Sequence, residues 1–191
     1  MRSKAEVKTL GIVLFEDGLH LREIARRAGI APAEAKKELD TLTLLGILKK
    51  ERKGNQLIFT VNPPCPFLTE LRWLYIKTEG AAEEIRRALS KTTGIKYSFI
   101  YGSTAAGNFS EKSDVDLLIV GSVSEEELSE KIAGAQKNTG REINWVLWNE
   151  RDFAGKLKEK GSFISSLLKG KKIWLRGDYD EFERIASKAV G

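Results

Sequence analysis

The chain has 191 residues, of which 41% are hydrophobic and 31% are charged. This composition excludes a disordered chain and suits one ordinary domain or two small ones. The net charge is +5, and residues 1–80 carry most of that surplus, with 14 Lys and Arg against 10 Asp and Glu. The N-terminal half is therefore the better candidate for contact with nucleic acid.

A single cysteine, Cys65, and a single histidine, His20, exclude an intramolecular disulfide and a Cys/His zinc site. A Cys–His nucleophilic dyad is formally possible, but Cys65 lies between two prolines and nothing in the sequence indicates that His20 approaches it. We therefore expect any catalysis to rest on carboxylates, hydroxyls, backbone amides or a bound metal. The first residues lack the apolar core of a signal peptide, and no apolar run is long enough to cross a bilayer. We therefore expect a cytoplasmic protein with no membrane partner.

The N-terminal part predicts three helices followed by a hairpin. Apolar residues at helical spacing indicate helices over residues 4–16, 21–28 and 32–45, and strand-like runs occupy residues 47–53 and 56–61. Gly29 suits the turn between the second and third helices, and Pro32 suits the first turn of the third. Gly54-Asn55 favours a tight hairpin turn between the strands.

This order of elements is typical of a winged helix-turn-helix domain. Residues 21–45 resemble that family closely, with Ala25 and Gly29 at its packing and turn positions, and the resemblance covers about residues 4–62. In such domains the third helix enters the major groove of DNA and the hairpin contacts phosphates. The resemblance therefore implies that double-stranded DNA is a partner.

Basic side chains on the second helix, the third helix and the hairpin are the candidate DNA contacts. These residues are Arg26, Arg27, Lys36, Lys37, Lys49, Lys50, Arg52 and Lys53. The third helix also carries Glu34, Glu38 and Asp40, which would repel phosphates if they faced them. A winged helix that docks a protein or forms a homodimer stays open as the alternative.

A stiff, proline-rich joint at residues 62–66 leads into a helix expected over residues 67–79, and Gly80 marks a boundary. We therefore expect a winged helix-turn-helix domain over residues 1–66, a connecting helix over 67–80 and a second domain over 81–191. The apolar residues of the connecting helix could support a homodimer or pack within one chain.

The second domain alternates helix and strand and is expected to be of the α+β class. Strands are predicted over residues 95–101, 114–120, 142–148 and 172–175, and helices over residues 82–89, 150–160, 162–168 and 179–189. Ser124 is expected to cap a further helix whose first turn holds Glu125–Glu127.

Asp114 and Asp116 lie two residues apart at the start of an apolar strand, so both carboxylates should point to one face while Val115 packs on the other. Two adjacent carboxylates repel each other unless a divalent cation lies between them. Gly102-Ser103 directly follows the preceding strand, where glycine permits a sharp turn and the close approach of a phosphate. If a helix begins at Thr104, its free amides would face the same point.

The pattern Gly-Ser, ten intervening residues and Asp-x-Asp resembles the signature of the DNA polymerase β-like nucleotidyltransferase superfamily, and most of all its minimal prokaryotic members. The resemblance covers roughly residues 82–150. It implies helices packed on one mixed sheet, Gly102 and Ser103 at the triphosphate, and Asp114 and Asp116 as catalytic ligands of Mg²⁺. It also implies transfer of a nucleoside monophosphate from a nucleoside triphosphate to a hydroxyl, with release of pyrophosphate.

The third carboxylate of that family comes from a later strand, here residues 141–147. Asn144 occupies the expected position, and an amide cannot act as a base. Glu142 shares its face and is the candidate third catalytic carboxylate. Lys112 and Arg141 are candidate phosphate contacts, and Arg141 and Asn144 are grouped with the nucleotide-binding residues.

Two functions follow from these patterns. The first is a magnesium-dependent nucleotidyltransferase, coupled to DNA binding, that modifies a protein, a nucleic acid or a small-molecule hydroxyl. The second is a DNA-binding regulator whose nucleotidyltransferase-like domain only binds nucleotide or is inactive. The third carboxylate discriminates between them.

Overall fold

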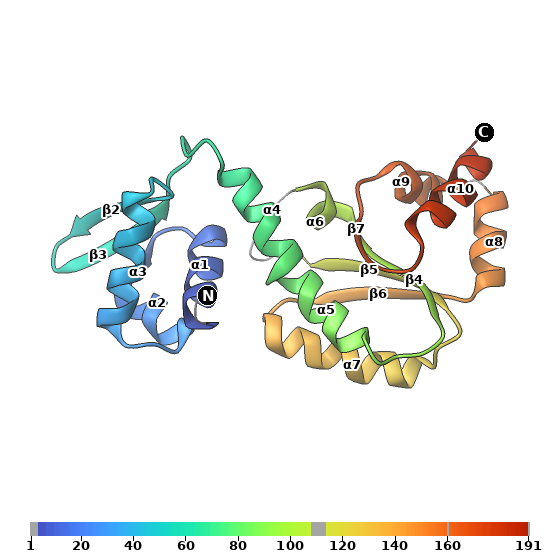
Figure 1. Ribbon diagram of the computed structural model, residues 1–191, viewed down its shortest axis with the longest axis horizontal. Coiled ribbons are helices and arrows are strands. Elements are labelled where there is room, and N and C mark those ends of the chain that lie inside the picture. The colour runs from blue at the N-terminus through green and yellow to red at the C-terminus, as the bar shows by residue number, and fades with distance from the viewer. Residues whose placement is uncertain (1–3, 108–113, 160, 191) are drawn as a thin grey trace. The chain divides into compact units, whose positions relative to one another are not determined.

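A computed structural model describes residues 4–107, 114–159 and 161–190 (Figure 1). Contacts between Cα atoms divide the chain into two compact units, Met1–Tyr75 and Ile76–Gly191. Helices with a small antiparallel sheet make up the first unit, and helices on a mixed sheet make up the second, which confirms the predicted α+β class.

The first unit contains three helices, three strands and the start of a fourth helix within its described residues. In chain order these are α1 (Lys4–Phe15), β1 (Leu19–His20), α2 (Leu21–Ala28), α3 (Pro32–Leu44), β2 (Leu48–Lys53), β3 (Gln56–Val61) and α4 (Leu68–Thr78). The three strands form an antiparallel sheet in the order β1-β3-β2. Strand β1 is not predicted by the sequence, because two residues are too short to show an alternating pattern.

Local chemistry explains the helix-turn-helix segment. Gly29 ends α2 with a positive φ of 75°, a conformation in which its amide bonds back to carbonyls of the helix. Pro32 occupies the first turn of α3, as expected. Leu14, Ile24 and Leu39 then meet Phe59 in a single buried cluster, which joins the three helices to the sheet.

The second unit is built on a four-stranded sheet in the order β6-β5-β4-β7. Its elements are α5 (Ala81–Leu89), β4 (Ile95–Tyr101), α6 (Gly102–Ala106), β5 (Val115–Gly121), α7 (Glu125–Thr139), β6 (Ile143–Trp148), α8 (Glu150–Glu159), α9 (Ser162–Lys169), β7 (Ile173–Arg176) and α10 (Tyr179–Val190). Strand β4 runs antiparallel to β5 and β7, whereas β6 runs parallel to β5. The sheet is therefore mixed, as the family resemblance implies.

Helices cover both faces of this sheet (Figure 1). Helices α5 and α7 lie on one side, and α8, α9 and α10 lie on the other. On the second side Tyr97, Phe99 and Leu118 of the strands pack in one cluster with Phe153 of α8 and Phe182 of α10. Ser124 caps α7 as predicted, since its Oγ accepts a hydrogen bond of 3.1 Å from the amide of Glu127.

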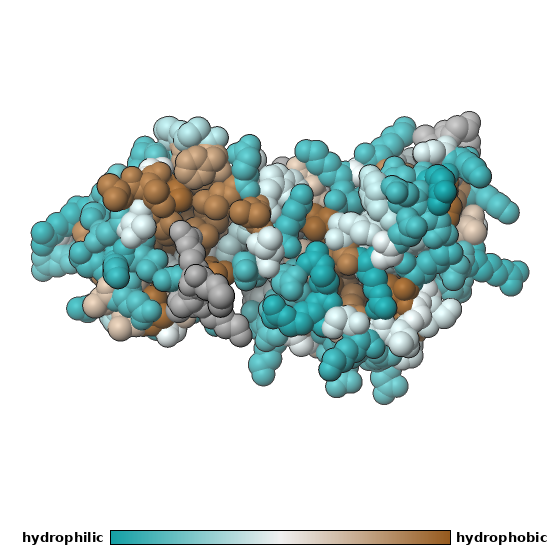
Figure 2. All heavy atoms as spheres, viewed as in Figure 1, coloured by the Kyte–Doolittle hydropathy of each residue, from teal (hydrophilic) through white to brown (hydrophobic). Residues whose placement is uncertain are grey.

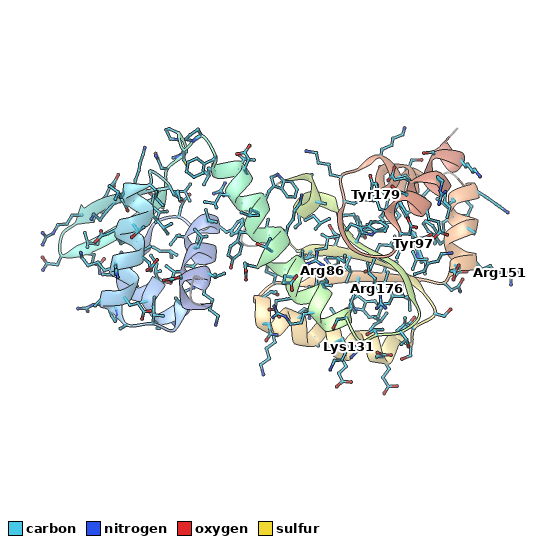
Figure 3. All side chains as sticks on the ribbon, in the orientation of Figure 1. Arg86, Tyr97, Lys131, Arg151, Arg176 and Tyr179 are labelled. Carbon is cyan, nitrogen blue, oxygen red and sulfur yellow. The ribbon has the colours of Figure 1, made fainter. Side chains whose placement is uncertain are left out.

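An arginine joins the edge strand β7 to the end of α5. One guanidinium nitrogen of Arg176 donates to the carbonyls of Leu89 at 3.2 Å and Thr92 at 2.5 Å (Figure 3). Arg86 reaches from α5 to the carbonyl of Trp174 at 3.5 Å. In the described part of the chain, no helix is both long enough and apolar enough to cross a bilayer.

The core of the first unit supplies a stability prediction within one helix. Leu39 is 0% exposed and Leu44, five residues later in α3, is 88% exposed. Leu39→Ala should lower the free energy of unfolding by about 2–5 kcal/mol, because it leaves a cavity among Leu14, Ile24 and Phe59. Leu44→Ala should change it by less than about 0.5 kcal/mol. Urea denaturation followed by circular dichroism measures both, and equal losses would contradict the observed packing.

Candidate functional site

Three neighbouring strands place Tyr101, Asp116 and Asn144 in one row across the sheet. Tyr101 of β4 pairs with Asp116 of β5, and Asp116 pairs with Asn144 of β6. Paired residues point to the same face of a sheet. This is the face on which α8, α9 and α10 pack, because Phe99 and Leu118 form the next paired row and belong to the aromatic cluster there.

Asp114 and Asp116 form the acidic part of the site. Strand β5 begins at Val115, one residue later than predicted, and Val115 is fully buried between an exposed Asp114 and a half-buried Asp116. Partial burial, together with the negative charge of Asp114, raises the pKa of the Asp116 carboxyl above its ordinary value. The two carboxylates are therefore close enough to repel each other, and a divalent cation between them would relieve that repulsion.

The Gly-Ser turn lies directly against this acidic pair. Gly102 has a positive φ of 72°, and a Cβ added to it would overlap the carboxylate of Asp116. Only glycine therefore allows the backbone to pass so close to the acid. Helix α6 begins at Gly102 and not at Thr104, so the amides of Gly102 and Ser103 themselves belong to its first turn.

Thr104 is a structural residue that the sequence analysis missed. Its side chain is buried, and its Oγ1 donates a hydrogen bond of 3.2 Å to the carbonyl of Asp114. The bond ties α6 to the residue that precedes β5, and so holds the Gly-Ser turn beside the two aspartates. The Gly-Ser-Thr sequence contained this hydroxyl, but no local pattern indicated its partner ten residues away.

Asn144, and not a third carboxylate, stands next to the acidic pair. Its Nδ2 donates to Oδ2 of Asp114 at 3.3 Å. Glu142 is exposed at the start of β6, and its backbone carbonyl accepts a hydrogen bond of 2.9 Å from the amide of Val115. Among the described residues, no three Asp, Glu, His or Cys side chains form a group that could hold a metal ion. The metal candidates that lie together are therefore Asp114 and Asp116.

The two basic phosphate candidates differ in their surroundings. Arg141 is partly buried in the turn between α7 and β6, where its amide donates to Oγ1 of Thr139 at 3.3 Å. It directly precedes Glu142, near the start of β6. Lys112 lies outside the described residues.

Part of the basic surface of the first unit is neutralised by acids. Asp40 on α3 accepts hydrogen bonds from Lys36 at 2.8 Å and from Lys50 on β2 at 2.6 Å. These two bonds lower the pKa of the Asp40 carboxyl. Arg27 forms an ion pair with Glu16. The repulsion expected from Asp40 is thus offset by its lysine partners.

The hairpin divides its basic residues between two faces. Lys50 and Arg52 are paired with Phe59 and Leu57, on the side of the sheet that faces the buried cluster of the unit, and alternation puts Lys49 and Lys53 on the opposite side. Lys37 is exposed on α3. The candidate DNA contacts therefore do not form one continuous stripe.

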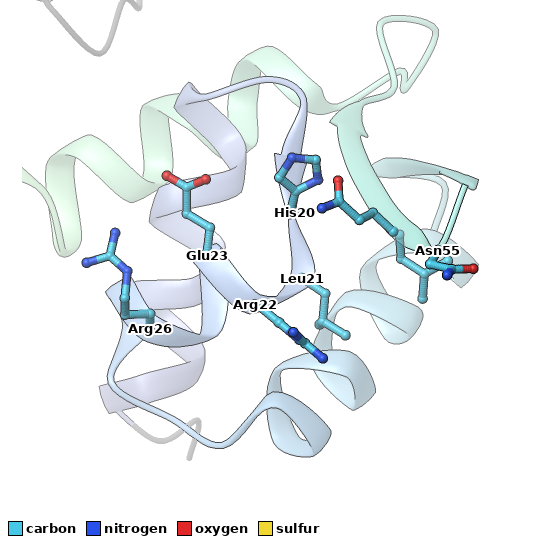
Figure 4. Close-up of a pocket in the computed structure, with 8 residues that line it drawn as sticks. His20, Leu21, Arg22, Glu23, Arg26 and Asn55 are labelled. Carbon is cyan, nitrogen blue, oxygen red and sulfur yellow. The ribbon is translucent and has the colours of Figure 1, made fainter. Parts of the chain in front are cut away.

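A pocket in the first unit lies between the start of α2 and the hairpin (Figure 4). Its lining includes His20, Arg22, Glu23, Arg26 and Asn55. The side chains of Arg22 and Arg26 point in different directions, so the two guanidinium groups do not converge on one point. The pocket thus has basic walls without a focused anion site.

Apolar surface also gathers on the visible face of the first unit (Figure 2). Among the described residues of that unit, the exposed large hydrophobic ones include Leu44, Leu45, Phe67 and Leu74. An apolar surface of this kind is compatible with the alternative of a docking or dimerising domain.

Solved structures with some likeness to the chain were found, and no curated protein matches it. A toxin–antitoxin with AMP-PNP is 15% identical, with 57% of this chain and 83% of that chain covered and a TM-score of 0.43. A tri-AMPylated HEPN toxin of Shewanella oneidensis in complex with MNT antitoxin is 12% identical, with coverages of 58% and 81% and a TM-score of 0.36. A MarR-family transcriptional regulator from Silicibacter pomeroyi is 20% identical, with coverages of 48% and 60% and a TM-score of 0.37.

These structural likenesses are too distant to carry an argument about function. The match of a family model is more informative, because it covers the sheet, the Gly-Ser turn and both aspartates. Residues 82–175 match the model described as a nucleotidyltransferase domain. This part of the chain therefore resembles a nucleotidyltransferase domain.

Proposed function

We propose that this protein is a magnesium-dependent nucleotidyltransferase that moves a nucleoside monophosphate from a nucleoside triphosphate to a hydroxyl acceptor. The observation that carries the proposal is the packing of the Gly102 backbone against the carboxylate of Asp116, which itself feels the charge of Asp114. A turn that only glycine can form and two repelling acids at one point suit a triphosphate with its cation.

Each residue of the site has a separate role in the proposed reaction. Asp114 and Asp116 would hold Mg²⁺, which supplies charge for the triphosphate and orients it. Gly102 and Ser103 offer backbone amides and a hydroxyl to the phosphate oxygens, and Asn144 and Arg141 are the further nucleotide contacts. The acceptor oxygen attacks the α-phosphorus, the bond from that phosphorus to the bridging oxygen breaks, and pyrophosphate leaves. The proton of the acceptor hydroxyl passes to a carboxylate, for which Glu142 is the candidate.

A second candidate function is nucleotide binding without transfer. The observation that favours it is the amide of Asn144 beside Asp114, in the row where the resemblance implies a third acid. An amide cannot accept the proton of the acceptor. In that case the protein would be a DNA-binding regulator that senses nucleotide through the same turn and the same two aspartates.

Label transfer tests the enzymatic function. Incubation with Mg²⁺ and each α-³²P-labelled nucleoside triphosphate, in the presence of a cell extract as acceptor source, should give labelled product and pyrophosphate. The variant that combines Asp114→Ala and Asp116→Ala should transfer label at least about 10²-fold more slowly than wild type, because it cannot bind the cation. The matched control is Asp152→Ala on α8, where an exposed acid is removed away from the site.

Two further variants separate the candidate functions. If Glu142 is the base, Glu142→Gln should lower the rate by about 10²–10⁴-fold while nucleotide affinity persists. If the site instead lacks a base, wild type should bind nucleotide without transfer, and Asn144→Asp should gain activity. Absence of both binding and transfer in wild type would refute both functions.

Thermal unfolding tests the metal site without any activity measurement. Asp116→Asn keeps the size of the side chain and removes one of the two like charges, so its Tm without divalent metal should exceed that of wild type by roughly 1–3 °C. Adding Mg²⁺ should raise the Tm of wild type much more than that of the variant, since the cation binds only the intact pair. Asp152→Asn on α8 serves as the charge-matched control. Equal Mg²⁺ shifts in wild type and Asp116→Asn would contradict the site.

We also propose that the first unit binds double-stranded DNA through α3 and the hairpin. The support is its helix-turn-helix order and the exposed basic residues of α3 and β2. Replacing Lys49, Lys50, Arg52 and Lys53 by alanine should weaken binding and flatten the slope of log affinity against log salt by about 0.9 for each phosphate that the hairpin no longer neutralises. Fluorescence anisotropy with a labelled duplex at several salt concentrations measures both quantities.

Two controls sharpen the DNA experiment. Alanine at Arg151, Lys158, Lys169 and Lys171, four exposed basic residues of the second unit, removes the same charge and should leave the slope unchanged. Asp40→Asn should strengthen binding, because it removes a negative charge and releases Lys36 and Lys50. A duplex affinity that survives the hairpin substitutions intact would rule out the hairpin as a contact.

A further inference from the structure

An exposed aromatic ring lies close to the candidate site. Phe163, near the start of α9, is 49% exposed, whereas most rings on that side of the sheet are buried in the aromatic cluster. Among the described residues of the second unit, the other large hydrophobic residue with such exposure is Tyr179. An exposed phenylalanine beside a polar site leaves part of an apolar ring open to a ligand, and burying that ring would be favourable.

Two neighbouring rings fix the orientation of Phe163. Its centroid lies 5.8 Å from that of Tyr101, with an angle of 80° between the ring planes, and 6.1 Å from that of Trp148, with an angle of 87°. Near-perpendicular contacts of this kind are favourable between aromatic rings. The ring is therefore held in place before any ligand binds, which reduces the entropy lost on binding.

The position of Tyr101 connects Phe163 to the phosphate turn. Tyr101 directly precedes Gly102 and pairs with Asp116 across the strands. The two side chains are therefore cross-strand neighbours on one face of the sheet, and the tyrosine is partly buried there. Tyr101 thus lies between Phe163 and Asp116. Ordinary cross-strand and ring spacings put the ring of Phe163 on the order of 10 Å from the carboxylate of Asp116.

Both features also lie on the same side of the sheet. The row of Tyr101, Asp116 and Asn144 faces the side on which α9 packs, where Ile164 and Leu167 of α9 are buried in the aromatic cluster. A nucleotide with its phosphates at Gly102 and Ser103 could therefore extend along this face without crossing a strand.

We infer that Phe163 is the platform on which the nucleobase of the triphosphate stacks. The inference rests on the proposed function, because it takes the phosphates to lie at the Gly-Ser turn. Stacking on an aromatic ring is open to every base and stronger for the larger purine face. The site should therefore prefer purine over pyrimidine nucleoside triphosphates, with Phe163 setting that preference.

Binding of a non-transferable nucleotide tests the inference. The probes are α,β-methylene-ATP and α,β-methylene-CTP with Mg²⁺, compared with inorganic triphosphate, which has no base, all by isothermal titration calorimetry. Phe163→Ala and Phe163→Leu should weaken binding of the ATP analogue about 5- to 100-fold. Phe163→Trp should retain it. The CTP analogue should be affected less, and the affinity for inorganic triphosphate should be unchanged in every variant.

The matched control is Tyr179→Ala, because Tyr179 has a similar exposed fraction of 52%. Tyr179 lies on α10 and packs against Trp174 of β7, not beside Tyr101. It should leave all three affinities unchanged. If Phe163→Ala binds the ATP analogue as tightly as wild type does, the platform is overturned. It is also overturned if the variant loses as much affinity for inorganic triphosphate as for the ATP analogue, because that result would indicate a purely structural role. Nucleotide binding that persists while transfer is lost would assign Phe163 to the acceptor and overturn the platform as well.

The outcomes separate this inference from the proposed function. Wild type that binds neither the analogues nor inorganic triphosphate would refute the proposed function, and the platform with it. If wild type binds the ATP analogue and transfers label, and Phe163→Ala does both equally well, the proposed function stands and only the platform is refuted.

Discussion

Repulsion between two carboxylates at the start of a buried strand is the constraint around which the second unit is arranged. Val115 is fully buried between Asp114 and Asp116, and Leu117 to Val120 are buried as well, so β5 cannot move to separate the acids. The fold thus holds two like charges close together, at a point where Asp116 is only partly exposed to water and Asn144 donates a hydrogen bond to Asp114. A divalent cation would supply the missing opposite charge, which is why the pair supports the proposed metal site better than either acid alone.

Strand direction decides what surrounds that pair. Because β4 runs antiparallel to β5, its end, with Tyr101 and Gly102, meets the beginning of β5. Because β6 runs parallel to β5, its beginning, with Asn144, lies there as well. One mixed sheet thus gathers a turn, two acids and an amide from segments separated by about 40 residues of sequence. The row that they form faces the side of the sheet on which α9 packs.

The two units use charge in opposite ways. In the first unit Asp40 accepts hydrogen bonds from Lys36 and Lys50, so exposed charges of opposite sign offset one another. Such pairs contribute little to stability, but they reduce the net positive charge of the surface that carries them. Among the described residues of the second unit, no ion pair offsets Asp114 or Asp116, and the amide of Asn144 donates a hydrogen bond to Asp114. The first arrangement lowers the net charge of an exposed surface, and the second leaves two negative charges close together.

The sequence by itself determined the α+β class, the helix-turn-helix order, the cap at Ser124 and the likeness to nucleotidyltransferase domains, because each depends on a local pattern of glycine, apolar spacing or short polar motif. Only the tertiary structure decided that α6 begins at Gly102, that Thr104 bonds to the carbonyl of Asp114, that Asn144 contacts Asp114 and that Phe163 lies beside Tyr101. Each of these depends on strand register or on helix packing between residues far apart in the chain. Local propensity carries no information about such distances, since the energy that sets them comes from burying side chains of one segment against another.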